Sequence, residues 1–193
     1  MKRILQKPTV KPKNKKELKD LIEFEMEKNG NRCDLNHIDV SLITNLSGLF
    51  LTSNFNGDIS KWDVLAVTDM SCMFEKAKFN GDISRWNVSS LMSMNAMFYG
   101  SKFNGDISKW DVSSVSGMSE AFEESNFCGD VSSWIRASAV HDSFMFSNSE
   151  IAKKLGIENP SFDEVKSHFL ALHLEINLEK APPLQVGSSK VRL

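Results

Sequence analysis

The sequence is poor in cysteine, with three among 193 residues, Cys33, Cys72 and Cys128. Their number is odd, and their spacing matches neither a CxxC motif nor a set of metal ligands. A disulfide framework is therefore not expected, and no metal site is predicted. This use of cysteine favours a reducing compartment.

Net charge and long apolar runs are scarce too. The formal net charge is −2, so the chain as a whole has no strong attraction to nucleic acid or to an anionic membrane. No stretch approaches the roughly 18 apolar residues of a membrane span, and the basic start of the chain lacks the apolar segment of a secretory signal. The sequence as given predicts a cytoplasmic protein, or a cell-surface protein if a leader is missing from it.

Catalytic motifs are missing as well. The histidines form no His-x-x-x-His pattern, and the chain has neither a Gly-x-Ser-x-Gly elbow nor a phosphate-binding loop. The four histidines are His37, His141, His168 and His173. We therefore predict that the protein is not an enzyme, has no catalytic residues and takes no cofactor.

What the sequence has instead is a repeat of 24 residues. The stretch FNGDISKWDV occupies positions 55–64 and 103–112, and it returns with two changes at 79–88. Tryptophan recurs at the same spacing, as Trp62, Trp86, Trp110 and Trp134. More divergent copies precede and follow these units, so about five units fill residues 31–150. A constant period of this kind indicates a stack of structurally equal units.

Each unit is expected to contribute one short strand. Polar and apolar residues alternate from Ser60 to Val64, which predicts that Trp62 and Val64 face the core while Lys61 and Asp63 face solvent. Strands of successive units are expected to pair in parallel at about 4.8 Å. The interior would then hold columns of aromatic and aliphatic side chains.

A helical turn is expected to follow each strand, because Val67, Met70, Met73 and Phe74 recur at helical spacing. The methionines are expected to fill gaps in the core. They are Met70, Met73, Met92, Met94, Met97, Met118 and Met145. The apolar residues of a unit also follow the L-x-x-L-x-L rhythm of leucine-rich repeats. Together these patterns predict an α/β repeat solenoid, a leucine-rich-repeat-like stack.

Helical caps are predicted at both ends of the stack. Asn14 followed by Glu17 marks the start of a helix that ends before Gly30, so residues 14–30 are expected to cover the first unit. Residues 151–181 are expected to form the second cap. The outer segments, a basic one at 1–13 and another at 182–193, are predicted to be flexible tails.

The second cap carries two apolar stripes. The seam that can cover the last unit consists of Phe162, Val165, Phe169, Leu172 and Ile176. Leu170, Leu174 and Leu178 form the other stripe, which needs a return segment of this chain or a partner, such as a second copy. Apolar residues also alternate strictly from Leu170 to Leu178, so a strand is the alternative to the favoured helix.

The repeat resembles that of a known family. The unit Phe-Asn-Gly-Asp-Ile-Ser-x-Trp-Asp-Val, followed by Met-x-x-Met-Phe, is similar to the repeat of BspA-like leucine-rich-repeat proteins, which are bacterial surface lipoproteins. The similarity runs from Asn31 to Ser149. It implies a leucine-rich-repeat-like solenoid and a role in adhesion or partner binding, and it implies no catalytic activity.

The candidate binding face consists of the outward positions beside the tryptophans. Such positions form columns on the predicted sheet, a surface on which solenoids commonly bind partners. The nine positions are Lys61, Asp63, Leu65, Arg85, Asn87, Ser89, Lys109, Asp111 and Ser113. Ala137 is the equivalent of Leu65 in the fifth unit. The alternative is that neighbouring opposite charges only neutralise one another in solvent.

Two other columns have structural interpretations. One is acidic and consists of Asp34, Asp58, Asp82, Asp106 and Asp130. We expect these carboxylates to accept backbone N–H groups within Asn-Gly-Asp turns, with calcium binding as the alternative. The four tryptophans are expected to pack in the core, with an exposed stacking platform as the alternative.

The start of the chain is basic. Seven basic residues precede the first acidic residue, Glu17: Lys2, Arg3, Lys7, Lys11, Lys13, Lys15 and Lys16. A solvated tail is the favoured interpretation, and a grip on nucleic-acid phosphates is the alternative.

The sequence therefore predicts a non-enzymatic protein-interaction scaffold. It would act as an inhibitor or effector that occludes or recruits a partner protein. A BspA-like surface adhesin and a nucleic-acid binder acting through the basic tail are the alternative functions.

Overall fold

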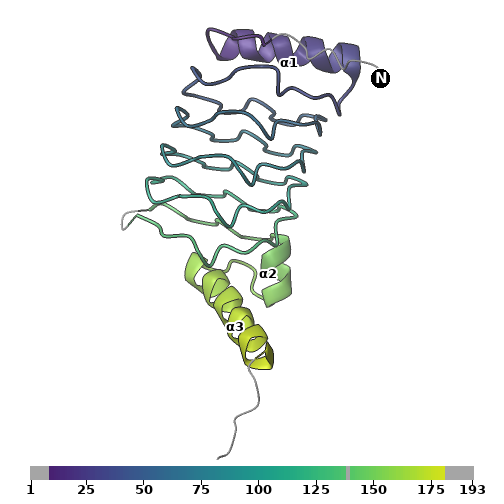
Figure 1. Cartoon of the computed structure of the whole chain (residues 1–193). Helices are drawn as coiled ribbons and strands as arrows, with labels where there is room; N and C mark the ends of the chain where they lie inside the picture. The colour runs from purple at the N-terminus through teal and green to yellow at the C-terminus, as the bar shows by residue number, and fades with distance from the viewer. Residues whose placement is uncertain (1–8, 138–139, 181–193) are drawn as a thin grey trace, which may run out of the picture.

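A computed structural model describes residues 9–137 and 140–180 of the chain. Coils of chain are stacked between a helix at one end and two helices at the other (Figure 1). Helix α1 spans Lys15–Asn29, α2 spans Glu150–Leu155 and α3 spans Phe162–Lys180. Residues 24 positions apart lie next to each other in adjacent coils, so the predicted repeat is confirmed.

Aromatic columns fill the interior of the stack. The rings of Trp62 and Trp86 lie parallel, with centroids 6.4 Å apart, and those of Trp86 and Trp110 are 6.5 Å apart. Phe74 and Phe98 continue a second column at 5.5 Å. All four tryptophans are at most 4 % exposed, so their predicted core packing is confirmed and an exposed stacking platform is excluded.

The tryptophan segment is a pair of turns and not the predicted strand. The Trp62 N–H donates to the Ile59 carbonyl at 3.1 Å, and the Val67 N–H donates to the Val64 carbonyl at 2.9 Å. The described residues contain only isolated parallel bridges, such as Asp34 with Asp58. The alternation of burial is nevertheless as expected, because Trp62 and Val64 are buried between exposed neighbours. Consecutive turns of this length alternate buried and exposed side chains in the same way as a strand does.

The second half of each unit is also not the helical turn that we expected. It carries the backbone bonds between coils, since Met70 and Phe74 donate to the carbonyls of Ser93 and Met97 at 2.9 and 2.8 Å. Tight turns occupy the residues between, and Cys72 and Lys76 have φ angles of 56° and 53°. A positive φ at the third residue is the mark of a type II turn. Parallel pairing between units therefore exists, but it recurs from unit to unit in the half where we predicted helix, whereas Asp34 and Asp58 pair in the tryptophan half of the first two units.

Side-chain bonds tie the tryptophan halves together. Each indole N–H donates to a backbone carbonyl of the preceding unit, as from Trp86 to Ile59 and from Trp110 to Ile83, both at 3.1 Å. The coils also approach closely at Gly57, where a Cβ atom would lie 2.0 Å from the Cys33 carbonyl oxygen. Only glycine fits at that contact.

Helix α1 covers the first coil. The Asn14 side chain accepts the Glu17 N–H at 3.0 Å, which is the N-cap that the sequence predicts. Leu18 and Ile22 are buried against the stack, and Leu21 and Met26 are partly buried.

Helix α3 covers the last coil with its first half. Phe162, Val165 and Phe169 are buried, and the Arg136 guanidinium lies 4.0 Å from the Phe162 ring centroid. The Lys166 ammonium donates to the Trp134 carbonyl at 3.0 Å. The helix runs unbroken through residues 170–178, so the helical interpretation of this segment is confirmed and the strand alternative is wrong.

The predicted flexible tails fall mostly outside the described residues. Residues 1–8 of the basic segment and all of the segment 182–193 lie outside the part of the chain that the structure describes. No described helix is both long and apolar enough to cross a bilayer.

Candidate functional site

The outward columns form one surface, which we call the ladder face: Lys61, Asp63, Leu65, Arg85, Asn87, Ser89, Lys109, Asp111 and Ser113. All nine side chains are exposed except that of Ser89, which is half-buried. In the described part of the chain, no ion pair joins the basic column to the acidic one. The predicted alternative of mutual neutralisation is therefore not seen at contact distance.

The acidic column of the ladder face instead closes turns. The Asp111 carboxylate accepts both the N–H and the hydroxyl of Ser113, at 3.1 and 2.6 Å. These hydrogen bonds, the one from the hydroxyl first, lower the pKa of Asp111 below its ordinary value. Asn87 makes the same pair of bonds with Ser89. Among the described residues, the basic side chains of the ladder face form no ion pair at contact distance, although their charges lower the pKa values of the aspartates three residues before them, Asp58, Asp82 and Asp106.

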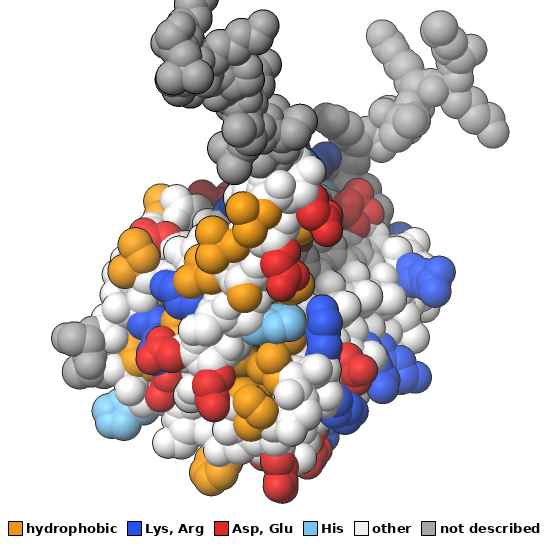
Figure 2. Space-filling model, turned by 90° about the horizontal axis from the view of Figure 1, so that it is seen from below, with side chains coloured by type: hydrophobic (Ala, Val, Ile, Leu, Met, Phe, Trp, Pro, Cys, Tyr) orange, Lys and Arg blue, Asp and Glu red, His pale blue; other side chains and the backbone are white. Residues whose placement is uncertain are grey.

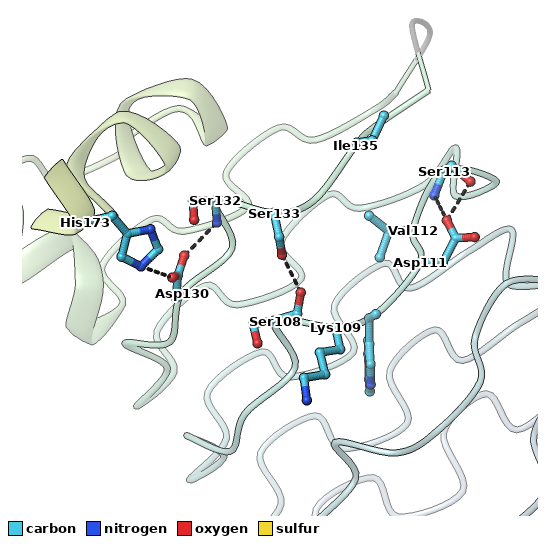
Figure 3. A pocket seen from close by; sticks show the side chains of 11 residues that line it. Ser108, Lys109, Asp111, Val112, Ser113, Asp130, Ser132, Ser133, Ile135 and His173 are labelled. Carbon is cyan, nitrogen blue, oxygen red and sulfur yellow. Dashed lines mark hydrogen bonds and ion pairs between the residues drawn. The ribbon is translucent and has the colours of Figure 1, made fainter. Parts of the chain in front are cut away.

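The ladder face ends at a groove, which we call the end groove. Its volume is about 810 Å³, and its lining includes Lys109, Asp111 and Ser113 from the ladder face. The fifth unit adds Ile135, and α3 adds His173 (Figure 3). Ile135 is 74 % exposed and occupies the position that Asp111 holds in the unit before. The column of polar residues therefore ends in an apolar side chain.

A polar contact joins α3 to the end groove. The His173 Nε2 atom lies 3.0 Å from a carboxylate oxygen of Asp130. Asp130 also accepts the Ser132 N–H at 2.7 Å. The hydroxyl of Ser133 donates to the Ser108 carbonyl, one coil away (Figure 3). These contacts fix the wall that the last coil and the helix share.

Sequence reasoning missed Ile135 and His173 as site residues. Ile135 was visible as a departure from the repeat, but such departures are also expected of any terminal unit. His173 gave no signal, because only the docking of α3 places it near Asp130. Ala137, the predicted fifth-unit equivalent of Leu65, is half-buried and does not line the end groove.

The aspartates of the Asn-Gly-Asp turns accept backbone N–H groups, as predicted. Asp82 and Asp106 bond the N–H groups of Ser84 and Ser108, both at 2.9 Å. Bonds from Ser84, its hydroxyl first, lower the pKa of Asp82. Within residues 9–137 and 140–180, no cluster of three or more His, Cys, Asp or Glu side chains could hold a metal ion.

The core interpretation of the methionines is wrong for one of them. Met92 is 56 % exposed, whereas Met70, Met94 and Met118 are fully buried. Met92 occupies the outward position that Thr68 holds in the unit before, and its N–H donates to the Thr68 carbonyl at 2.9 Å. Spacing alone did not distinguish this position from the buried one two residues later.

The second stripe of α3 lies uncovered. Leu170, Leu174 and Leu178 are 46, 64 and 74 % exposed, and the helix extends away from the last coil (Figure 1). Hydrophobic side chains follow it in the view from the end of the stack (Figure 2). Ile176, which we predicted in the covering seam, is 45 % exposed, because the helix has already passed the edge of the coil there.

The stacked coils and their outward columns define a repeat protein. A family model described as Mycoplasma protein of unknown function, DUF285, matches residues 19–134 and 90–167. These matches span more than half of the sequence, so the chain belongs to this family. None of the curated proteins and none of the solved structures with which the chain was compared matches it.

Proposed function

We propose that the chain is a non-enzymatic scaffold that binds another protein through the ladder face and the end groove. The observation that carries this proposal is the exposed basic column of Lys61, Arg85 and Lys109, which makes no contact-distance ion pair among the described residues and runs into a groove with exposed Ile135. Charged groups at a rim steer a partner, and an apolar residue at the centre of a contact supplies affinity. Binding there would occlude or recruit the partner.

The proposed mode of binding is that of a leucine-rich-repeat-like solenoid. The stack is held by buried aromatic columns and by bonds between coils, so its outward side chains have fixed spacing. A rigid surface loses little conformational entropy on binding. The same surface would serve a BspA-like adhesin, and fractionation of the native cell separates the proposed cytoplasmic location from a surface one.

The experiment is affinity capture from the native cell followed by mass spectrometry. The double variant Arg85→Glu with Lys109→Glu is expected to lose the captured protein, because it reverses two of the three charges of the basic column. Lys78→Glu with Lys102→Glu is the matched control, since these exposed lysines are also one unit apart and lie outside the ladder face. Equal capture by the wild type and the ladder variant would reject this surface.

A further inference from the structure

A second outward surface differs strongly from unit to unit. Two positions in every unit have positive φ angles, between 51° and 60°. The first column consists of Gly48, Cys72, Ala96, Glu120 and Phe144, and the second of Thr52, Lys76, Gly100, Glu124 and Asn148. Within either column no amino acid occurs twice. The ladder face, by contrast, repeats lysine or arginine and aspartate or asparagine.

The varied side chains are held at an energetic cost. Glycine adopts the left-handed conformation freely, whereas other residues lose about 1 kcal/mol or more. The stack uses glycine in each column only once, at Gly48 and at Gly100. Phe144 is a bulky aromatic residue at a φ of 57°, and it is 54 % exposed. An exposed ring contributes little to the packing between coils, so we infer that Phe144 serves a contact at the surface.

These columns border a groove, which we call the turn groove. Its volume is about 520 Å³, and it shares no residue with the end groove. Its lining combines aromatic and charged side chains, namely Glu75, Lys76, Tyr99, Glu120, Glu123 and Phe144. The Lys76 ammonium lies 5.2 Å from the Tyr99 ring centroid. The groove thus has an aromatic rim and an acidic wall.

Among the described residues, Glu75, Glu120, Glu123 and Glu124 form no ion pair at contact distance. Lys76 is the basic residue of the groove lining. Burial raises the pKa of Glu123, and the charges of Glu120 and Glu124 raise it further. Burial likewise raises the pKa of Tyr99, with Glu124 as the next cause. In both groups the negative charge of neighbouring glutamates adds to the effect of burial.

We propose that the turn groove binds a basic segment of a partner protein. Lysine or arginine side chains of the segment would face Glu75, Glu120 and Glu123, and an apolar side chain would pack between Tyr99 and Phe144. Charge complementarity selects this occupant. The inference shares with the proposed function the premise that the chain binds protein, but it uses none of the residues of the ladder face.

The experiment uses the full chain and a fluorescein-labelled peptide of sequence KRLKRLK, followed by fluorescence anisotropy at low salt. Binding is expected, and the double variant Glu120→Gln with Glu123→Gln is expected to weaken it by about tenfold or more. The Phe144→Ser variant is expected to weaken it too. Asp20→Asn with Glu27→Gln removes the same charge from exposed positions of helix α1, and it is the matched control that should bind normally.

Two outcomes would overturn the inference. One is a peptide affinity that falls equally in the control and in the turn-groove variant, because the peptide would then sense only net charge. The other is self-association in sedimentation experiments that the Glu120→Gln and Glu123→Gln changes abolish, because the basic start of a second copy would then be the occupant. Circular dichroism checks that each exposed substitution leaves the fold intact. Failure of capture by the ladder face would leave this result unaffected.

Discussion

At the scale of single residues, the positions with positive φ trade stability of the fold for variety in the exposed side chains. Ten such positions occur in five units, and eight of them carry a side chain. A Cβ atom at positive φ is crowded by its own backbone, which is the reason why glycine is favoured there. The ladder face and the core need no such conformations.

This balance predicts opposite effects for the same substitution at two sites. Ala96→Gly, at a φ of 51°, is expected to raise the free energy of unfolding by about 0.5–1 kcal/mol, because the strain is relieved. Ala66→Gly, at an exposed turn position without positive φ, is expected to lower it by a similar amount, because the unfolded chain gains entropy. Urea denaturation measures both. A loss of stability in both variants would contradict the strain argument.

Cys72 offers a second residue-scale prediction. Burial first, and then Glu75, raise the pKa of its thiol from 9.0 to about 11. At a pH well below 9 the thiolate is therefore about a hundredfold scarcer than in an ordinary cysteine. Iodoacetamide is expected to modify Cys72 correspondingly slowly in a Cys128→Ser background, as followed by mass spectrometry.

The Cys72 prediction has an internal test. Glu75→Gln is expected to accelerate the modification, because it removes a negative charge that disfavours the thiolate. Unfolding the protein in urea should accelerate it further. A reaction as fast in the native protein as in urea would show that neither burial nor the charge of Glu75 suppresses the thiolate, and an unchanged rate in Glu75→Gln would show that the charge does not.

At the scale of elements, the aromatic columns and the bonds between coils hold one unit to the next. Trp62 and Trp86 contribute twice, because the ring of each stacks on the next tryptophan ring and its indole N–H donates to the preceding coil. The Ile59 carbonyl, for instance, accepts from the Trp86 indole and from the Trp62 backbone. The indole bond is the one that crosses between units.

Trp86→Phe isolates that bond. Phenylalanine keeps an aromatic ring in the column but leaves the buried Ile59 carbonyl with a single donor, so we expect a loss of about 1–3 kcal/mol in the free energy of unfolding. Arg85→Lys, at the exposed neighbouring residue, is the control and should change stability by less than about 0.5 kcal/mol. Equal urea midpoints for the two variants would refute a structural role for the indole bond.

The elements also show where sequence reasoning succeeds. Both caps follow from local chemistry, since Asn14 closes the first turn of α1 and an apolar seam begins α3 at Phe162. The orientation of Trp62 and Lys61 followed from alternation. The turn conformation did not, because consecutive tight turns bury alternate residues as a strand does. The left-handed residues escaped notice for a different reason, since Cys72, Glu120 and Phe144 are not the residues that usually signal positive φ.

The ladder face was predictable from the sequence, whereas the grooves were not. Repetition at 24 residues brings Arg85 next to Lys109 whatever the local backbone is. The end groove requires His173, which only the path of α3 places beside Asp130. The turn groove requires Phe144 to lie beside Glu120, and this depends on a turn type that spacing does not reveal.

At the scale of the whole molecule, the stack is a one-dimensional array in which each coil contacts only its neighbours. The stability of such an array is a sum over coils and the contacts between them. The caps at α1 and α3 close the two ends, and the middle units are interchangeable in their buried positions.

This architecture predicts that one complete unit can be removed. Deletion of residues 79–102 joins Lys78 to Phe103 and restores every column, so the shortened chain is expected to fold cooperatively with a lower melting temperature. Deletion of residues 79–90 is the matched control, and it should prevent native stacking because the buried positions fall out of register. Circular dichroism with thermal unfolding compares them. Equal melting of the two deletions would mean that the register of the stack does not matter.

The direction of the bonds between coils has a mechanical consequence. Met70, Phe74 and their equivalents donate along the long axis of the stack, so tension applied to its two ends pulls on these bonds in series. The coil with the weakest attachment would peel away first and release about 80 Å of slack chain, while the others stayed wound. Under tension the protein would therefore extend in steps of one unit, and the coils that remain stacked would keep their outward surfaces in place.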